Sequence, residues 1–274
     1  MFHSCDAYEV LYKGCIYYFN KYWSSEIPVT KYFITEEKDV HFAGFKNIKS
    51  GTGAWTSRLH HAISQIDEPY IIYFQEDYWL TQKVEPSYFE KIMAAVEKLN
   101  PALLKLHDQT GDYKFLENAE VEVAGLIMKR LDVGKSDFIL SHRASIWRKD
   151  FFLDQLTIKE SPWQNEMFGT QRLRKTSEKI YMLDYLRDNE KGKIDSPDFS
   201  HYYTVAESGK LNHFTSYFIE NIKKDKLAEQ DMLEYMDQIN AIYASQSPLV
   251  QNLAKFSLID RAKIKWNRLV RLNN

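Results

Sequence analysis

The sequence predicts an α/β protein with a mainly parallel mixed sheet flanked by helices. A chain of 274 residues can bury the core of one large α/β domain. Segments with helical spacing of apolar residues alternate with short β-branched and aromatic runs. Residues 70–80 (YIIYFQEDYWL) pass from strand-forming residues directly into the acids Glu76 and Asp77. Because ligands collect at the carboxyl ends of strands in such sheets, we expect a site there.

The first half of the chain alternates helices with strands. Pro28 follows the first helical segment and Pro86 begins the third. This order implies right-handed crossovers and parallel neighbouring strands. The expected helices cover residues 6–23, 55–66 and 86–99, and the expected strands cover 29–35, 70–74 and 102–106.

The second half changes character. Residues 110–155 are expected to form antiparallel strands, with a helix starting near Arg148, and residues 171–187 to be largely helical. Loop and strand are expected over 191–210, and helices beyond Phe214. We therefore predict one α/β domain over 1–215 and a helical C-terminal extension over 216–274.

Composition narrows the function classes. The formal net charge is -2, so the chain lacks the global basic excess of most nucleic-acid-binding proteins, and we expect no nucleic-acid partner. Cys5 and Cys15 are the only cysteines, which gives no disulfide framework and fits a reducing compartment. No window holds the ~18 apolar residues that a membrane span needs. The chain is expected to be cytoplasmic.

The acid pair suits a ligand with two phosphates. Mg²⁺ or Mn²⁺ binds hard oxygen ligands, commonly one or two carboxylates together with phosphate oxygens. Asp77 is the candidate metal ligand, and Glu76 either supports it or turns toward the rest of the ligand. The alternative is that both acids cap a strand end and are solvated.

Four short motifs in a fixed order resemble the GT-A nucleotide-sugar glycosyltransferases. The resemblance covers roughly residues 1–215 and is closest to bacterial forms that build capsule and other surface polysaccharides. The chain departs from that family in its metal motif, where QED replaces Asp-x-Asp, so metal dependence stays open. The motifs are Cys5-Asp6-x-Tyr8, Trp55-x-x-Arg58-Leu59, Gln75-Glu76-Asp77-Tyr78 and Ser161-Pro162-Trp163-x-x-Glu166.

The resemblance implies a donor site at the end of the first strand. Its base and ribose contacts would fall on Ser4, Cys5, Asp6 and Tyr8, although Asp6 equally fits a cap for the helix that follows.

The helix before the acid pair would line the same donor pocket. Trp55 would contact the donor, and Arg58 would either pair with a phosphate or form a surface salt bridge. Gly51 and Gly53 just upstream would let the backbone approach a phosphate.

On the acceptor side the resemblance implies a stacking face from Trp163 and a general base from Glu166. The alternative places Trp163 in the core and Glu166 at a helix start, where the dipole favours an acid. A late histidine, His201, is a candidate to complete the metal shell, or else is structural.

The tail, residues 255–274, carries six Lys or Arg against one Asp in a helical apolar pattern. A basic amphipathic helix of this kind binds anionic membrane surfaces, which would make the protein peripheral at the inner face of the cell membrane. The alternative is a terminal helix docked on its own domain or on a second subunit.

We therefore expect a glycosyltransferase, inverting because a candidate base is present, that moves a sugar from a UDP or GDP sugar to a saccharide or lipid-linked saccharide acceptor. A metal-dependent nucleotidyltransferase is the second enzymatic hypothesis, although GTG near residue 52 lacks the following Gly-Lys-Ser or Gly-Lys-Thr. A non-catalytic carbohydrate-binding or scaffold protein is the third.

Overall fold

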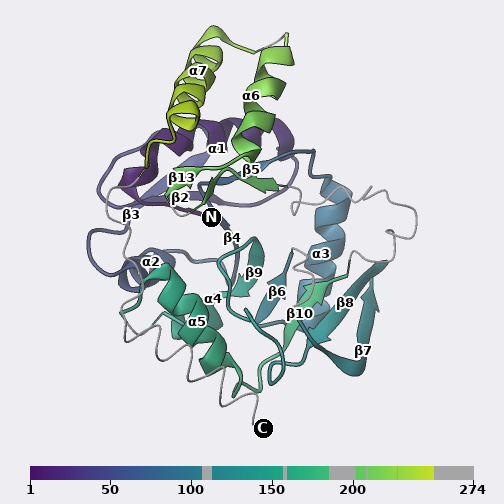
Figure 1. The fold of residues 1–274 in the computed structure, drawn as a ribbon. Coiled ribbons are helices and arrows are strands. Elements are labelled where there is room, and N and C mark those ends of the chain that lie inside the picture. Colours follow the sequence, from purple (N-terminus) through teal and green to yellow (C-terminus); the bar gives the residue numbers. More distant parts are fainter. Residues whose placement is uncertain (107–112, 157–158, 185–201, 208, 227, 250–274) are drawn as a thin grey trace.

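The computed structural model describes residues 1–106, 113–156, 159–184, 202–207, 209–226 and 228–249. Its centre is a nine-stranded sheet in the order β3-β2-β1-β4-β9-β6-β10-β8-β7 (Figure 1). Only β8 and β9 run against the other strands of this sheet, so the predicted mainly parallel mixed sheet is confirmed. The strands are β1 (Phe2–His3), β2 (Lys31–Thr35), β3 (Phe45–Lys49), β4 (Tyr70–Gln75), β6 (Leu103–Lys105), β7 (Phe115–Val123), β8 (Leu126–Leu131), β9 (Ser145–Arg148) and β10 (Ile180–Leu183).

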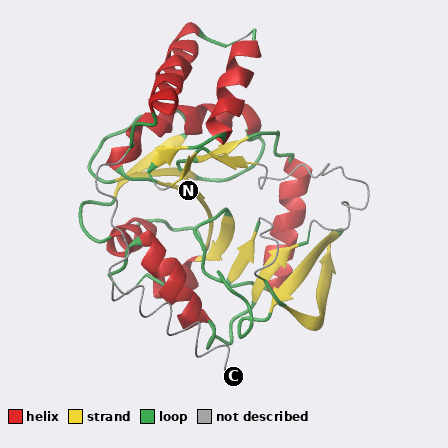
Figure 2. Cartoon of the chain, in the orientation of Figure 1, coloured by secondary structure: helices red, strands yellow, loops and turns green. Residues whose placement is uncertain are grey.

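Helices cover both faces of the sheet, as Figure 2 shows, so apolar cores form on both sides. Phe2, Phe33 and Phe74 of the sheet point into one core. Ile34 and Tyr73, their neighbours along β2 and β4, point into the other, because adjacent side chains of a strand face opposite sides. The first core receives the one-turn helix η1 (Asp6–Tyr8), α1 (Glu9–Tyr22), α3 (Pro86–Leu99), α6 (Phe214–Lys224) and α7 (Gln230–Ser245); the second receives α2 (Trp55–Ser64), α4 (Lys149–Asp154) and α5 (Pro162–Leu173).

Residues 78–80, which follow the two acids, pack against α1. Trp79 lies in the short strand β5 (Tyr78–Leu80) and is fully buried. A Cβ on Gly14 would lie 2.2 Å from its ring, so only glycine allows α1 to approach this closely. The indole of Trp79 in turn donates to the carbonyl of Glu76 at 3.1 Å, which fixes the turn that carries the two acids.

Three small strands complete the structure near the acids. β11 (Tyr202–Thr204) pairs with β5, and β12 (Ala206–Glu207) pairs with β13 (Lys210–Leu211). The backbone N–H of Val205 donates to the carbonyl of Asp77 at 2.9 Å, so this late segment lies directly against the turn.

One predicted element is wrong. Residues 171–187 were expected to be largely helical, but α5 ends at Leu173 and Ile180–Leu183 form β10. All four residues of β10 are buried between β6 and β8, and a strand buried on both faces has no alternation that distinguishes it from a helix. Residues 185–187 lie outside the described part of the chain.

Helices α6 and α7 stand side by side next to α1 (Figure 1). The hydroxyl of Tyr18 donates to the carbonyl of Phe218 at 3.0 Å, and that of Tyr235 to the carbonyl of Val10 at 2.7 Å. The two helices therefore share the core of the sheet, and a boundary at residue 215 stays a proposal.

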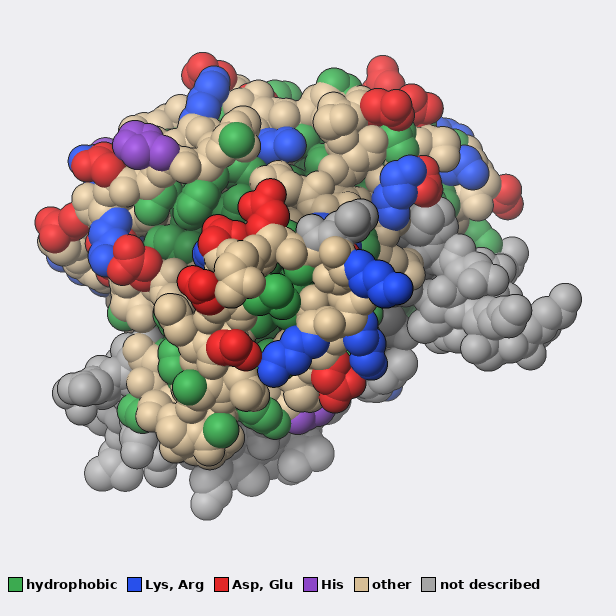
Figure 3. Space-filling view, turned by 90° about the horizontal axis from the view of Figure 1, so that it is seen from above, with side chains coloured by type: hydrophobic (Ala, Val, Ile, Leu, Met, Phe, Trp, Pro, Cys, Tyr) green, Lys and Arg blue, Asp and Glu red, His purple; other side chains and the backbone are tan. Residues whose placement is uncertain are grey.

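No helix in the described ranges is long and apolar enough to cross a membrane. The basic tail at 255–274 lies outside the described residues. On the face drawn in Figure 3, acidic and basic side chains are interspersed.

Candidate active site

A cleft of about 670 Å³ opens at the carboxyl edge of the sheet. β1, β2, β4 and β6 run in the same direction and end at this edge, while the antiparallel β9 begins there. The cleft therefore lies where the sequence predicted a site. Of the residues proposed from the sequence, it is lined by Ser4, Cys5, Tyr8, Gly53, Trp55, Arg58, Glu76, Asp77, Trp163 and Glu166.

The acid pair forms one wall of the cleft. Glu76 is only 7% exposed, and burial together with the Asp77 carboxylate raises its pKa well above the usual range. Burial also raises the pKa of Asp77 to about 7. Within the described structure, Asp77 Oδ1 is buried without a hydrogen-bond partner. A buried oxygen without a partner is costly, which makes Asp77 a candidate contact for a ligand of the cleft.

Arg58 supplies a buried positive charge to the α2 wall of the cleft. It is 6% exposed, and its Nη1 lies 3.3 Å from Glu36 Oε1, so it is not the surface salt bridge of the alternative interpretation. Its Nε has no partner among the described residues. The guanidinium is thus held by one carboxylate and still has a donor available.

Trp55 begins α2 and packs beside two histidines. Its ring centroid lies 5.1 Å from that of His3 and 4.4 Å from that of His142. The indole is half-buried and lines the cleft, so part of its ring stays open to a ligand.

Asp6 does not cap the helix that follows it, and its role in donor binding stays a prediction. It does not line the cleft, and Cys5 occupies the N-cap position of η1 without a side-chain bond. Its carboxylate accepts the backbone N–H groups of Glu36, Glu37 and Lys38 at 2.9 to 3.1 Å. It therefore ties the loop after β1 to the loop after β2.

Another wall of the cleft is built on the first turns of α5. Ser161 and Gln164 form a capping box, and Pro162 occupies the first turn. Trp163 is half-buried and lines the cleft, whereas the alternative interpretation placed it in the core. Glu166 faces the same space, and its Oε1 accepts the backbone N–H of His142 at 2.8 Å. Burial raises the pKa of Glu166, and the His142 N–H opposes that rise.

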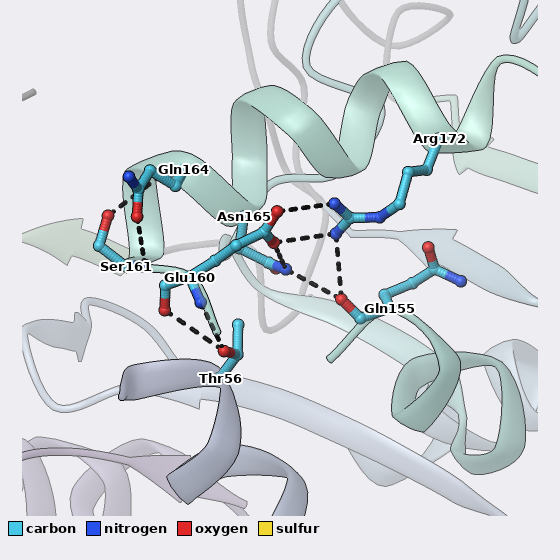
Figure 4. A network of polar contacts seen from close by, with 7 residues as sticks. All are labelled: Thr56, Gln155, Glu160, Ser161, Gln164, Asn165 and Arg172. Atoms are coloured by element: carbon cyan, nitrogen blue, oxygen red, sulfur yellow. Dashed lines mark hydrogen bonds and ion pairs between the residues drawn. The ribbon is translucent and has the colours of Figure 1, made fainter. Parts of the chain in front are cut away.

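A buried polar network fixes where α5 begins (Figure 4). The Glu160 carboxylate pairs with Arg172 at 2.7 and 3.0 Å and accepts from Asn165 Nδ2 at 2.8 Å. The Thr56 hydroxyl of α2 accepts the Glu160 backbone N–H at 2.9 Å. Because Asn165 directly precedes Glu166, this network fixes the position of Glu166 relative to α2.

Two histidines of the cleft were not predicted as site residues. His3 ends β1, with Nδ1 3.2 Å from the Tyr73 hydroxyl, and His142 lies just before β9. Neither ring nitrogen of His142 has a hydrogen-bond partner within the described ranges, and burial together with Lys105 lowers its pKa to about 3. Both imidazoles are therefore kept uncharged at neutral pH. No motif marks them; only the position of β9 beside β4 brings His142 to the cleft.

The residues present fit a divalent ion only in part. The described residues contain no group of three His, Cys, Asp or Glu placed to hold a metal. Two adjacent carboxylates with an unpaired oxygen nevertheless match the protein share of a Mg²⁺ site that a diphosphate completes. His201 lies outside the described residues.

No protein-family model and no curated protein matches this chain. Three solved structures of S. aureus TarS resemble it, each with a TM-score of 0.43. TarS residues 1–349 are 14% identical, with 90% of this chain and 71% of that chain covered. The complex of the same protein with UDP is 13% identical over 96% and 78%, and the complex with UDP-GlcNAc is 13% identical over 90% and 72%. Because this similarity is low, we infer the function from the cleft itself.

Proposed function

We propose that this protein is a glycosyltransferase that moves a sugar from a nucleotide-sugar donor to a saccharide acceptor. One observation carries the proposal: a single cleft at the carboxyl edge of the sheet contains an acid pair with an unpaired oxygen and a separate, half-buried carboxylate, Glu166, on another element. A transfer reaction needs both groups, one to hold the leaving diphosphate and one to take a proton.

The donor would lie along the wall formed by the acid pair, Arg58 and Trp55. Asp77, supported by Glu76, would hold a Mg²⁺ or Mn²⁺ ion that neutralises the diphosphate. Arg58 lines the cleft and would donate to a phosphate oxygen of the donor. Cys5 and Tyr8 line the end of the cleft formed by the first strand, where the nucleoside would bind.

The acceptor would stack on Trp163 with a hydroxyl directed at Glu166. The carboxylate takes the hydroxyl proton as that oxygen forms a bond to the anomeric carbon. The bond from this carbon to the diphosphate oxygen breaks on the opposite face, and the electron pair leaves with the diphosphate. The configuration is inverted because attack and departure occur on opposite faces.

The same proposal covers the setting of the reaction. We propose a UDP or GDP sugar as the donor. The acceptor would belong to the synthesis of bacterial capsule or another surface polysaccharide, and residues 255–274 would contact the membrane.

Thermal shift with nucleoside diphosphates is the first test. We expect UDP, GDP or CDP to raise the melting temperature in the presence of Mn²⁺, and Asp77→Asn to remove that shift. Asp237→Asn, at an exposed site on α7, is the matched control. Stabilisation by free glycans alone would support a binding protein and reject the transferase.

A further inference from the structure

Lys105 is a fully buried lysine that the proposed reaction does not use. It is the last residue of β6, at the same sheet edge as the acid pair, yet it does not line the cleft. Its Nζ donates to the Ser141 hydroxyl at 2.8 Å and lies 5.0 Å from the centroid of the Tyr113 ring. A buried ammonium is expensive unless an opposite charge lies near it.

Glu166 is that opposite charge. Lys105 donates to Ser141, and the next residue, His142, donates its backbone N–H to Glu166. One two-residue segment therefore contacts both the ammonium and the carboxylate. Burial lowers the pKa of Lys105 to about 7, and the Glu166 carboxylate opposes this.

Within the described ranges, two cations act on Glu166. Lys105 and Arg143 both act to lower its pKa, against the rise caused by burial. Tyr73 and Tyr78 face it as neutral phenols, because burial raises the pKa of each well above its usual range. The His142 ring is uncharged, as described above. Lys105 is the buried cation of this set, so solvent screens it least.

We propose that Lys105 is a positioning residue that keeps Glu166 ionised from behind the wall of the cleft. A general base must be a carboxylate before the acceptor arrives, and a buried carboxyl without a nearby cation would hold its proton. The proposal rests on the proposed function for its purpose, but the ionisation of Glu166 can be measured without turnover.

The test measures the titration of Glu166 in the full chain. Carboxyl-¹³C glutamate labelling gives one resonance per glutamate, and Glu166→Gln identifies the one of interest. We expect Lys105→Met to move its midpoint upward by about one pH unit, the low end of the effect of an adjacent charge. Lys105→Arg should stay close to wild type, and Lys135→Met, at an exposed lysine, should not move it. An unchanged midpoint in folded Lys105→Met would overturn the proposal.

Ser141→Ala is a second variant that tests the proposal even if Lys105→Met does not fold. It removes the acceptor that holds the ammonium and leaves the charge, so a smaller upward shift is expected; no shift in a folded Ser141→Ala protein also counts against the proposal. If transfer is detected, the acid limb of kcat/KM should move with the NMR midpoint while KM for the donor stays constant. A shifted midpoint in a protein without transferase activity would reject the proposed function and leave the Lys105 relationship standing.

Discussion

Arg172 on α5 forms a bidentate ion pair with Glu160, the residue two positions before that helix begins, with N–O distances of 2.7 and 3.0 Å. The pair ties the last turn of α5 to the segment that enters it. Through Thr56 it also reaches the start of α2, which carries Arg58. The α2 and α5 walls of the cleft are thus held by one polar network rather than by two independent elements.

Removing one partner of this pair should destabilise the fold. Arg172→Met leaves the Glu160 carboxylate, only 6% exposed, without its cation, and we expect a loss of about 2–3 kcal/mol in the free energy of unfolding, below the full cost of breaking a buried pair because Arg172 is partly exposed. Urea denaturation measures this. Lys175→Met, at an exposed lysine just beyond the helix, is the control.

The double variant Glu160→Gln/Arg172→Met separates the charge from the packing. It should recover part of the loss, because no unpaired carboxylate remains. If the loss of unfolding free energy in the double variant equals the sum of the losses in Glu160→Gln alone and Arg172→Met alone, the ion pair is not the source of the effect.

His142 should make the protein sensitive to mild acid. Its pKa is lowered from 6.5 to about 3, so between these values the unfolded chain binds a proton that the folded chain does not. Stability therefore falls as the pH drops below about 6.5. Between pH 7 and pH 5 the wild type should lose about 2 kcal/mol more than His142→Asn, which cannot titrate.

Chemical denaturation at the two pH values gives this difference directly, since effects of the substitution that do not depend on pH cancel. His61→Asn, at an exposed site on α2, should follow the wild type. Parallel losses in wild type and His142→Asn would show that this histidine is charged in the folded protein.

The sequence was sufficient for the main architecture because its long elements carry strong periodic signals. Residues 86–99 were predicted as a helix with the observed bounds, since Pro86 starts the apolar pattern and the helix ends before Asn100 in a left-handed conformation. The short strands β1 and β3 were not assigned from pattern. β1 has two residues, and β3 is an edge strand with exposed lysines.

Two kinds of sequence signal reached residues that line the cleft: chain direction for the acid pair, and the ordered motifs for Trp55, Arg58, Trp163 and Glu166. Glu76 and Asp77 follow a strand, so they had to emerge at the carboxyl edge. Lys105 and His142 reach the same edge because β9 inserts antiparallel between β4 and β6, and this pairing depends on contacts between segments distant in sequence. Asp6 was expected to bind the donor or to cap a helix, but its carboxylate accepts three backbone N–H groups of the loop after β2, a contact between distant segments that the sequence pattern does not show.

Glu166→Gln separates chemistry from binding. The amide keeps an oxygen that can accept the His142 N–H, so the shape of the cleft should be preserved while the proton acceptor is lost. We expect transfer to fall by about 10²–10⁴-fold, the usual contribution of a general base. Donor binding, measured by calorimetry with a nucleoside diphosphate and Mn²⁺, should be nearly unchanged, because Glu166 lies on α5 and the acid pair follows β4.

Glu90→Gln, at an exposed site on α3, is the matched control. A Glu166→Gln protein with near-normal turnover would remove Glu166 as the base, whereas loss of nucleotide binding would place it on the donor side of the cleft.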